Sequence, residues 1–300
     1  MESVTTCPAC TSTRRTRITS RGKDFVGQEI VGCLDCGGLY QSPRLDPDEL
    51  AAYYRSEYSL RYRGAATPDA AAIALRDRVA QYRFDRLRRH GLLLPGETLL
   101  EIGCGAGNFL RLCRSGGMLA CGIEPSAGYA EHARADGLDV QVGMFPDCRG
   151  SSSHYDAVAL FHVLEHLPDP AATLTAVREL LSPHASVAVE IPEWGRALGP
   201  RWSERYFHAP HLVDFTRASL RCLLERTGYV VTLEDFGPAP DRRHHLLVVA
   251  RPTPAPVAPT PLASSAIHRQ FRRLRAWIAI SRITGPAFRG VRSLTAASGP

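Results

Sequence analysis

Apolar and polar positions across residues 96–250 alternate between two patterns, short continuous apolar runs and longer stretches with helical spacing. The apolar runs predict strands over 98–102, 118–123, 138–142, 156–161, 186–191, 229–236 and 245–250. The helical spacing predicts helices over 107–115, 126–136, 171–181 and 217–227. Such alternation is typical of a mostly parallel sheet with helices on both faces. We therefore predict a doubly wound α/β domain over residues 96–250.

A segment of different character, residues 46–95, precedes this domain. Residues 69–90 have the amphipathic spacing of a long helix, with inner positions at Ile73, Val79, Tyr82 and Leu87. Four tyrosines lie before it, at Tyr53, Tyr54, Tyr58 and Tyr62. These aromatic rings either pack between two parts of the chain or form a lid over a substrate. We treat 46–95 as a helical linker or lid.

Residues 192–215 interrupt the alternation with a stretch rich in aromatic residues, arginine and histidine. The stretch follows the carboxyl end of an expected strand, and ligands of open α/β sheets bind at that edge. We therefore expect residues 192–215 to cover a substrate.

The C-terminal part of the chain consists of a proline-rich linker over 251–265 and a basic tail over 266–300. Within residues 266–283, apolar and basic side chains occupy opposite faces of a helix. The apolar positions are Ile267, Phe271, Leu274 and Ile278, and the basic ones are Arg269, Arg272, Arg273 and Arg275. Such a helix docks on an anionic membrane surface, on another protein or on the chain's own domain.

Composition narrows the class of protein. The chain has 300 residues, 44% of them hydrophobic, which is enough for a large core with additions. No apolar run approaches the roughly 20 residues of a membrane span. The first residues lack the pattern of a signal peptide, so we expect a cytosolic protein. The net charge is +6, but residues 251–300 hold eight arginines and no acid, so the remainder is slightly acidic. The body therefore does not have the basic character of a nucleic-acid-binding domain.

Two C-x-x-C pairs lie within residues 1–45, at Cys7 and Cys10 and at Cys33 and Cys36. Paired knuckles of this kind typically hold a zinc ion through four thiolates. The segment has few apolar residues of its own, so a bound metal would supply much of its folding energy. Four thiolates leave no open coordination position, which favours a structural zinc ion over a catalytic one.

The most informative stretch is Leu99–Leu110, where an apolar run leads through a glycine-rich turn into a helical pattern. A strand, a glycine turn and a helix form a ligand-binding corner in α/β sheets. The spacing is G-x-G-x-G, since Asn108 stands where the dinucleotide fingerprint has its last glycine.

Two acidic residues flank this corner. Glu101 ends the first strand, where its carboxylate would repel a pyrophosphate and attract a cation. Glu124 ends the next apolar run, at a position where a carboxylate can accept both hydroxyls of a ribose. A nucleoside with a positive charge in place of phosphates satisfies both, and S-adenosylmethionine is such a ligand.

With these residues the sequence resembles the class I S-adenosylmethionine-dependent methyltransferases. The resemblance implies a Rossmann-like sheet of seven strands with the last one antiparallel. It also implies that the methyl donor contacts Glu101, Gly103, Cys104, Gly105, Gly107, Asn108, Glu124, Pro125, Met144, Phe145, Phe161 and His162. At the expected place, the segment VGMFPD lacks the acid that the family usually positions beside the adenine. Contact with the adenine would therefore rest on backbone and stacking.

A second motif, His162–Leu167 (HVLEHL), ends the fourth expected strand and resembles a motif of small-molecule methyltransferases. The resemblance implies that His166, with His208 or His211, contacts the methyl acceptor, and His162 is a further candidate. A histidine at these positions either accepts a proton near neutral pH or holds the loop by hydrogen bonds. A divalent cation at His162, Glu165 and His166 is an alternative, although the comparable metal motif begins with an acid.

Over residues 5–250 the chain resembles zinc-ribbon-bearing bacterial methyltransferases of sugar or natural-product pathways. We therefore expect methyl transfer to oxygen or carbon of a small-molecule or glycan-linked acceptor. Two alternatives stay open, a nucleic-acid methyltransferase that binds through the basic tail and a non-enzymatic scaffold. The charge of the body argues against the first, and the intact Glu101, Glu124 and HVLEHL motif argue against the second.

Overall fold

The structure is a computed structural model, and it describes residues 1–46, 48–50, 67–150, 152, 154–197, 206–238, 240, 244–254 and 263–294. The chain is built around a seven-stranded sheet in the order β10-β11-β8-β7-β4-β5-β6. Its strands are β4 (Thr98–Ile102), β5 (Leu119–Glu124), β6 (Asp139–Val142), β7 (Tyr155–Phe161), β8 (Leu181–Pro192), β10 (Tyr229–Pro238) and β11 (His244–Pro252). The five neighbouring strands β8, β7, β4, β5 and β6 pair in parallel. Strand β11 runs antiparallel to both of its neighbours, β8 and β10. The expected Rossmann-like fold is therefore confirmed.

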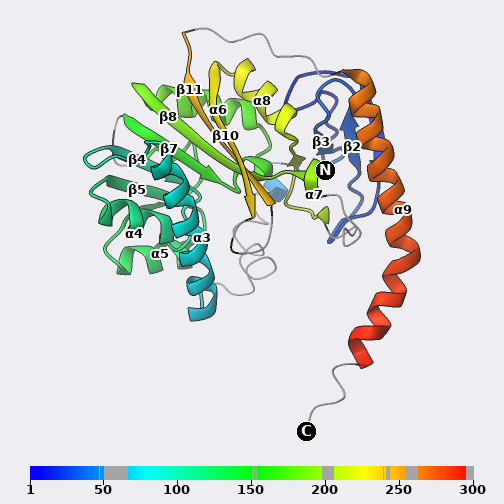
Figure 1. Cartoon of the computed structure of the whole chain (residues 1–300), viewed down its shortest axis with the longest axis horizontal. Coiled ribbons are helices and arrows are strands. Elements are labelled where there is room, and N and C mark those ends of the chain that lie inside the picture. Colours follow the sequence, from blue (N-terminus) through cyan, green and yellow to red (C-terminus); the bar gives the residue numbers. More distant parts are fainter. Residues whose placement is uncertain are drawn as a thin grey trace.

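Helices cover both faces of this sheet (Figure 1). They are α3 (Ala70–Arg89), α4 (Asn108–Ser115), α5 (Ala127–Ala135), α6 (Pro170–Glu179) and α8 (Arg217–Arg226). Neighbouring residues of β4 show the two-sided core: Leu99 packs in a cluster with side chains of α3, α4 and α5, and Leu100 in one with α6 and α8. Because successive side chains of a strand point to opposite faces, a continuous apolar run is what this central strand requires.

A second, smaller sheet contains four antiparallel strands in the order β1-β2-β3-β9. Three of them come from the N-terminal segment: β1 (Arg15–Thr19), β2 (Ile30–Cys33) and β3 (Leu39–Gln41). The fourth, β9 (Val213–Asp214), comes from the far end of the chain's 192–215 interruption and pairs with β3. The end of the expected substrate cover is thus a strand of the small sheet. The short helix α7 (Trp194–Ala197) begins the same interruption, and residues 198–205 lie outside the described part.

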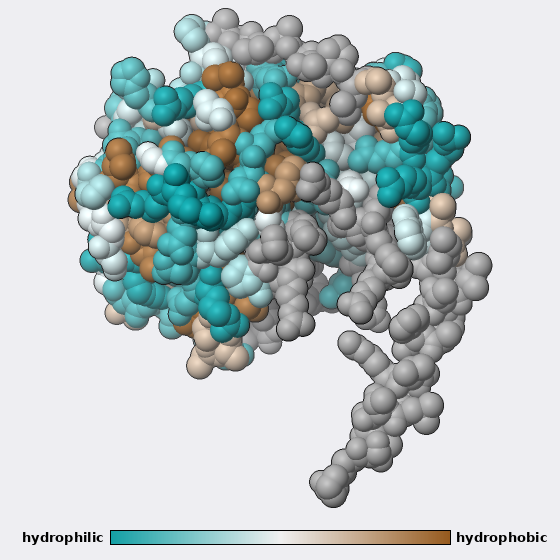
Figure 2. Space-filling view, viewed as in Figure 1, coloured by the Kyte–Doolittle hydropathy of each residue, from teal (hydrophilic) through white to brown (hydrophobic). Residues whose placement is uncertain are grey.

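The basic tail forms the long helix α9 (Ser264–Leu294), which lies along the small sheet (Figure 1). All four expected apolar positions, Ile267, Phe271, Leu274 and Ile278, are buried in one cluster with residues of β2, β3 and α7. Phe271 stacks on Trp194 with ring centroids 6.0 Å apart. Three docking surfaces were considered for this helix: a membrane, another protein and the chain itself. In the structure, its apolar face packs on the chain's own small sheet. Figure 2 shows hydrophilic residues on the outer side of this part of α9.

Some sequence expectations fall on positions that the structure does not describe. Tyr53, Tyr54, Tyr58 and Tyr62 lie outside the described residues, as does most of the linker over 251–265. Within the described residues, no helix combines the length and the apolar character needed to cross a bilayer.

Candidate functional site

A cavity of about 350 Å³ opens at the carboxyl end of β4, where the sequence analysis placed the ligand. Its walls come from the ends of β4, β5 and β7, the loops that follow them, and one face of α3. Nearly all of the residues expected to contact the methyl donor line this cavity. They are Glu101, Gly103, Cys104, Gly105, Asn108, Glu124, Pro125, Met144, Phe145, Phe161 and His162.

The glycine loop forms the floor of the cavity. Gly105 has a φ of +58°, and a side chain there would point into space whose nearest other atom is Arg76 Nη1, 3.7 Å from the Cβ position. The missing Cβ thus leaves room for a ligand against bare backbone. Gly107 is not among the lining residues. It precedes α4 with a φ of +75°, and a Cβ there would collide with Leu138, so its role is to let α4 begin.

Glu101 is a buried carboxyl group in the wall of the cavity. Its Oε2 receives no hydrogen bond from any residue that the structure describes. Burial raises the pKa of Glu101 to about 8, against the opposing effect of the Arg83 guanidinium. A buried acid without a donor is costly unless a ligand supplies one, and a cation that entered here would favour the ionised form.

Glu124 lies at the end of β5 and is 1% exposed. Its Oε2 accepts the N–H of Gly105 at 2.8 Å, and its Oε1 accepts the N–H of Ser126 at 2.9 Å. These two bonds fix the carboxylate at the edge of the glycine loop. A carboxylate oxygen can accept more than one hydrogen bond, so these two bonds do not by themselves prevent Glu124 from binding a ligand hydroxyl.

Helix α3 supplies a wall that the sequence analysis did not assign to the donor. Leu75, Arg76, Val79, Ala80 and Arg83 all line the cavity. The helix is held against the glycine loop by Asn108, whose Nδ2 donates to Asp77 Oδ1 at 2.7 Å. The signal for these contacts was present, because positions i, i+3, i+4 and i+7 share one helix face. The sequence analysis assigned no role to the two arginines on that face, Arg76 and Arg83.

His162 follows β7 with a φ of +55°, a conformation that non-glycine residues seldom adopt. Its Nδ1 lies 3.1 Å from Glu165 Oε1, and its Nε2 lies 3.4 Å from Glu190 Oε1. Burial alone would lower the pKa of His162, but hydrogen bonds to these two carboxylates outweigh it and raise the pKa to about 9. His162 is therefore an imidazolium at neutral pH, which makes it a poor proton acceptor.

His166 has the opposite electrostatic character. Its Nδ1 lies 2.9 Å from the carbonyl oxygen of Pro210 and therefore carries the proton. Burial, together with the neighbouring His211, lowers the pKa of His166 to about 4, so the ring is neutral with a lone pair on Nε2. His166 also lines the cavity. Of the four candidate histidines, this one therefore combines a place in the cavity lining with a ring that is neutral at pH 7.

His211 and His208 stand behind His166. The rings of His166 and His211 are 4.7 Å apart, and those of His208 and His211 are 3.9 Å apart. His211 Nδ1 lies 3.5 Å from Asp214 Oδ1. Burial and the nearby Glu165 carboxylate raise the pKa of Asp214 well above its usual range. The structure thus brings three predicted histidines together and adds Asp214, which the sequence analysis missed.

The ligand set considered for a divalent cation, His162, Glu165 and His166, does not converge in this form. Within the described residues, ligand atoms of Glu165 and His166 converge with His211, and those of His162 converge with Glu190 and His245. The second set is already balanced by charge, because Arg83 Nη2 lies 2.6 Å from Glu190 Oε1. The strand pairing of β8, β7 and β11 decides this partition, which the local sequence spacing does not reveal.

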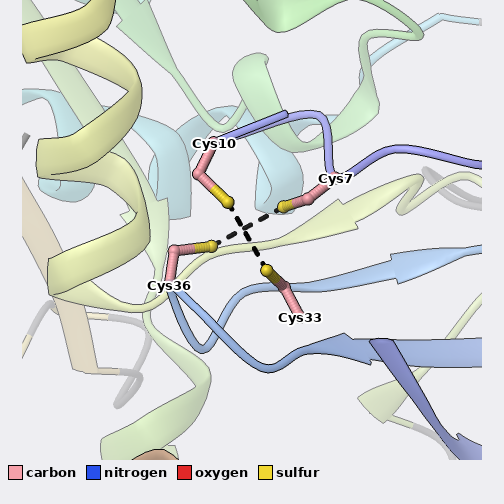
Figure 3. Close-up of side chains that lie close together, drawn as sticks. All are labelled: Cys7, Cys10, Cys33 and Cys36. Atoms are coloured by element: carbon pink, nitrogen blue, oxygen red, sulfur yellow. Dashed lines mark hydrogen bonds between the residues drawn. The ribbon is translucent and has the colours of Figure 1, made fainter. Parts of the chain in front are cut away.

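The four N-terminal cysteines form a separate centre, remote in sequence from the cavity residues. Their thiols point toward one another (Figure 3), and the sulfur atoms lie within 4.8 Å of one another. The Cys7–Cys36 and Cys10–Cys33 pairs are separated by 3.6 and 3.4 Å between their Sγ atoms. No disulfide joins them. Four convergent thiols around a common centre have the donor set and the arrangement that a tetrahedral zinc ion requires.

Comparison with known sequences finds a family model described as a methyltransferase domain, which matches residues 73–234, more than half of the chain. The ubiquinone biosynthesis O-methyltransferase of Pseudoalteromonas translucida is 35% identical over 104 residues, covering 32% of this chain and 44% of that protein. The enzyme of the same name from Pasteurella multocida is 26% identical over 111 residues, covering 31% and 46%. The chain spans less than half the length of these curated relatives.

Solved structures share the fold. The 1,6-didemethyltoxoflavin-N1-methyltransferase of Burkholderia thailandensis, bound to 1,6-didemethyltoxoflavin and S-adenosylhomocysteine, matches with a TM-score of 0.55 and 20% identity, covering 78% of this chain and 100% of that one. The magnesium protoporphyrin IX methyltransferase of Synechocystis, bound to S-adenosylhomocysteine, matches with a TM-score of 0.50 and 16% identity, covering 68% and 99%.

Proposed function

Because this chain belongs to the methyltransferase-domain family, we propose that it transfers a methyl group from S-adenosylmethionine to a small-molecule or glycan-linked acceptor. The single observation that carries the proposal is Glu101, a buried carboxyl group that lines the cavity and whose Oε2 has no donor among the described residues. A nucleotide phosphate would be repelled there, whereas the sulfonium and amino groups of this donor supply positive charge.

On the donor side, the chain's own groups have separate tasks. Glu124 is oriented by two backbone N–H groups in the lining of the cavity, where its carboxylate would accept the ribose hydroxyls. Phe161 and Phe145 provide apolar wall, while Gly105 leaves the backbone bare. When bound, the donor supplies an electrophilic methyl group on a good leaving group. The protein's contribution is to align the acceptor atom with that methyl carbon and to exclude water.

On the acceptor side, we propose His166 as the residue that contacts the acceptor, with His211 and His208 behind it. The ring of His166 is neutral and its Nδ1–H donates to the Pro210 carbonyl, so Nε2 is the ring nitrogen that bears the lone pair. That lone pair can accept a proton from a hydroxyl group or an acidic carbon as the methyl group arrives. The imidazolium of His162 is proposed as a fixed positive charge that balances Glu165 and Glu190.

We further propose that the acceptor atom, which receives the methyl group, is an oxygen. The curated relatives named as ubiquinone biosynthesis O-methyltransferases favour oxygen over carbon. The match to them covers about a third of this chain. The acidic body of the chain gives no support to a nucleic-acid acceptor.

We also propose that Cys7, Cys10, Cys33 and Cys36 bind one structural zinc ion. The support is the convergence of four sulfur atoms inside a unit that has few apolar side chains of its own. As thiolates, the four groups would fill the coordination sphere of the metal and leave no site for substrate.

Calorimetry on the full-length chain tests the donor proposal. We expect S-adenosylmethionine and S-adenosylhomocysteine to bind with one site per chain, and Glu124→Ala to weaken both. Release of S-adenosylhomocysteine in the presence of a panel of catechols, hydroxyquinols and nucleotide sugars then reports turnover. Absence of binding by both nucleosides would overturn the proposed function.

A further inference from the structure

The acceptor-side histidines lie on a segment that the small sheet holds in place. We define residues 206–212 as the histidine loop, because it carries His208 and His211. From its contacts we infer that Gln41, a residue of β3 in the small sheet, is a positioning residue for these two histidines. The assignment of the histidines to the acceptor rests on the proposed function, whereas the contacts of Gln41 do not.

The side-chain amide of Gln41 faces three main-chain carbonyl groups of the histidine loop. Its Nε2 lies 2.7 Å from the oxygen of His211 and 3.1 Å from the oxygens of His208 and Ala209. The side chain is 1% exposed, so water does not compete for these bonds. The reverse orientation of the amide would set its oxygen against three other oxygens, so the contacts fix which end faces the loop.

Main-chain bonds extend the same connection. The N–H of Gln41 donates to the oxygen of Leu212 at 3.0 Å, and the N–H of Lys23 donates to the oxygen of Phe207. On its other side, the loop is bound to the methyltransferase domain where the N–H of Leu212 donates to the oxygen of Glu165 at 2.9 Å. The loop is therefore clamped between the small sheet and the segment that carries His166.

This clamp gives Gln41 an influence on the acceptor side of the cavity. Three carbonyl oxygens within four consecutive residues point at one amide, which sets the curvature of the loop from His208 to His211. That curvature determines how the His211 ring meets His166, 4.7 Å away. It also places the Pro210 carbonyl, which fixes the tautomer of His166. The donor side has no such link, since Glu101, Glu124 and the glycine loop belong to β4, β5 and their connections.

The donor side and the acceptor side of the cavity therefore depend on different parts of the structure. The large sheet, its connections and helix α3 build the donor side of the cavity, whereas the acceptor side needs the small sheet, which the cysteine cluster supports. Loss of the Gln41 amide is expected to disturb the histidines and to spare the methyl donor.

The experiment compares full-length, zinc-loaded variants. Gln41→Met keeps the length of the side chain and removes both N–H groups, and Gln41→Glu places carboxylate oxygens against the three carbonyls. Gln41→Asn keeps the amide on a shorter side chain and serves as the milder variant if Gln41→Met fails to fold. The matched control is Ser12→Ala, which removes a hydrogen bond to Asp35 within the small-sheet unit and does not touch the histidine loop.

Three readouts require no knowledge of the acceptor: amide exchange in the histidine loop, nitrogen NMR signals of histidine rings, and calorimetric affinity for S-adenosylhomocysteine. In Gln41→Met we expect exchange at residues 207–212 to accelerate roughly tenfold or more, because a buried hydrogen-bonded amide is lost. The ring signals of His166, His208 and His211 should shift, while those of His162 and His245 stay. Affinity for S-adenosylhomocysteine should stay within about twofold.

Gln41→Glu should show the same changes more strongly, and Gln41→Asn should be intermediate. Unchanged exchange and unchanged histidine signals in Gln41→Met would overturn the inference, as would equal changes in Ser12→Ala, because general weakening of the unit would then explain them. If the native chain bound no S-adenosylhomocysteine, the proposed function would fail while the histidine signals still tested Gln41.

Discussion

The N–H of Gly105 donates a hydrogen bond of 2.8 Å to Glu124 Oε2, which joins the glycine loop after β4 to the end of β5. One carboxylate thus shapes the floor of the cavity and forms part of its rim. Glu124→Ala removes both contributions, and we expect the affinity for S-adenosylmethionine to fall about tenfold to a hundredfold, the range for charged hydrogen bonds. Calorimetry measures it. Glu131→Ala, an exposed position of α5, should bind normally; equal affinities in the two variants would contradict the role of Glu124.

Donor binding should depend on pH through Glu101. The pKa of this carboxyl group is raised to about 8 by burial, so at pH 7 it is mostly protonated before the ligand binds. A cationic ligand favours the carboxylate, so binding releases a proton and affinity increases as the pH rises toward 8, then levels off. Calorimetry in buffers of different ionisation enthalpy measures this release.

Glu101→Gln supplies the control for that prediction. The amide cannot ionise, so proton release and the increase of affinity with pH should both disappear. A pH dependence that persisted in Glu101→Gln would assign the proton to another group.

Removal of the His166 ring should separate turnover from binding. We expect His166→Ala to lower the rate of methyl transfer about a hundredfold or more, which is typical for loss of a proton-transfer group. Affinity for S-adenosylhomocysteine should persist, because the donor contacts come from β4, β5 and β7. His184→Ala, an exposed position on β8, should retain full turnover. A His166→Ala variant with normal turnover would remove this residue from the proposed chemistry.

Disruption of the cysteine cluster should affect one unit of the molecule. In Cys36→Ser we expect the zinc content to fall from about one ion per chain toward zero and the small sheet to lose protection from proteolysis. Donor affinity should change little, since the donor cavity lies in the large sheet. Cys148→Ser, a half-buried thiol after β6, should keep its zinc. Retention of zinc by Cys36→Ser would show that the metal is bound elsewhere.

The docking of α9 on the small sheet should contribute measurably to stability. Phe271 is 2% exposed and stacks on Trp194, so Phe271→Ala should cost about 3–5 kcal/mol of unfolding free energy. Urea unfolding followed by tryptophan fluorescence measures this cost. Arg272→Ala, on the exposed face of the same helix, should lie within about 0.5 kcal/mol of the native chain. A Phe271→Ala chain as stable as Arg272→Ala would indicate that the helix leaves the sheet in solution.

Much of the large sheet was predictable because each of its elements carries a local signal. The run from Leu99 to Ile102 is apolar on both sides of the strand, and the structure places β4 over Thr98–Ile102. Helix α8, expected over 217–227, spans Arg217–Arg226 with a Thr216 cap. The positions of Glu101 and Glu124 at the ends of their strands were fixed by the same patterns.

The acceptor side was less accessible to prediction, because its residues come from distant parts of the chain. Nothing near His211 in the sequence indicates Gln41, and nothing near His162 indicates Glu190 or His245. These partners meet only through the pairing of β3 with β9 and of β8 with β7 and β11. Of the residues considered for a divalent cation, Glu165 and His166 therefore converge with His211, whereas His162 belongs to a different group.

The sequence by itself determined most strands and helices of the large sheet, where the glycine loop lies, and which four thiols face one another, since these depend on periodicity and short spacings. The tertiary structure alone decided the partners of each histidine, and with them which ring is charged and which is neutral. The physical reason is that a pKa depends on burial and on the charges within a few ångströms, and folding, not sequence order, brings those charges together.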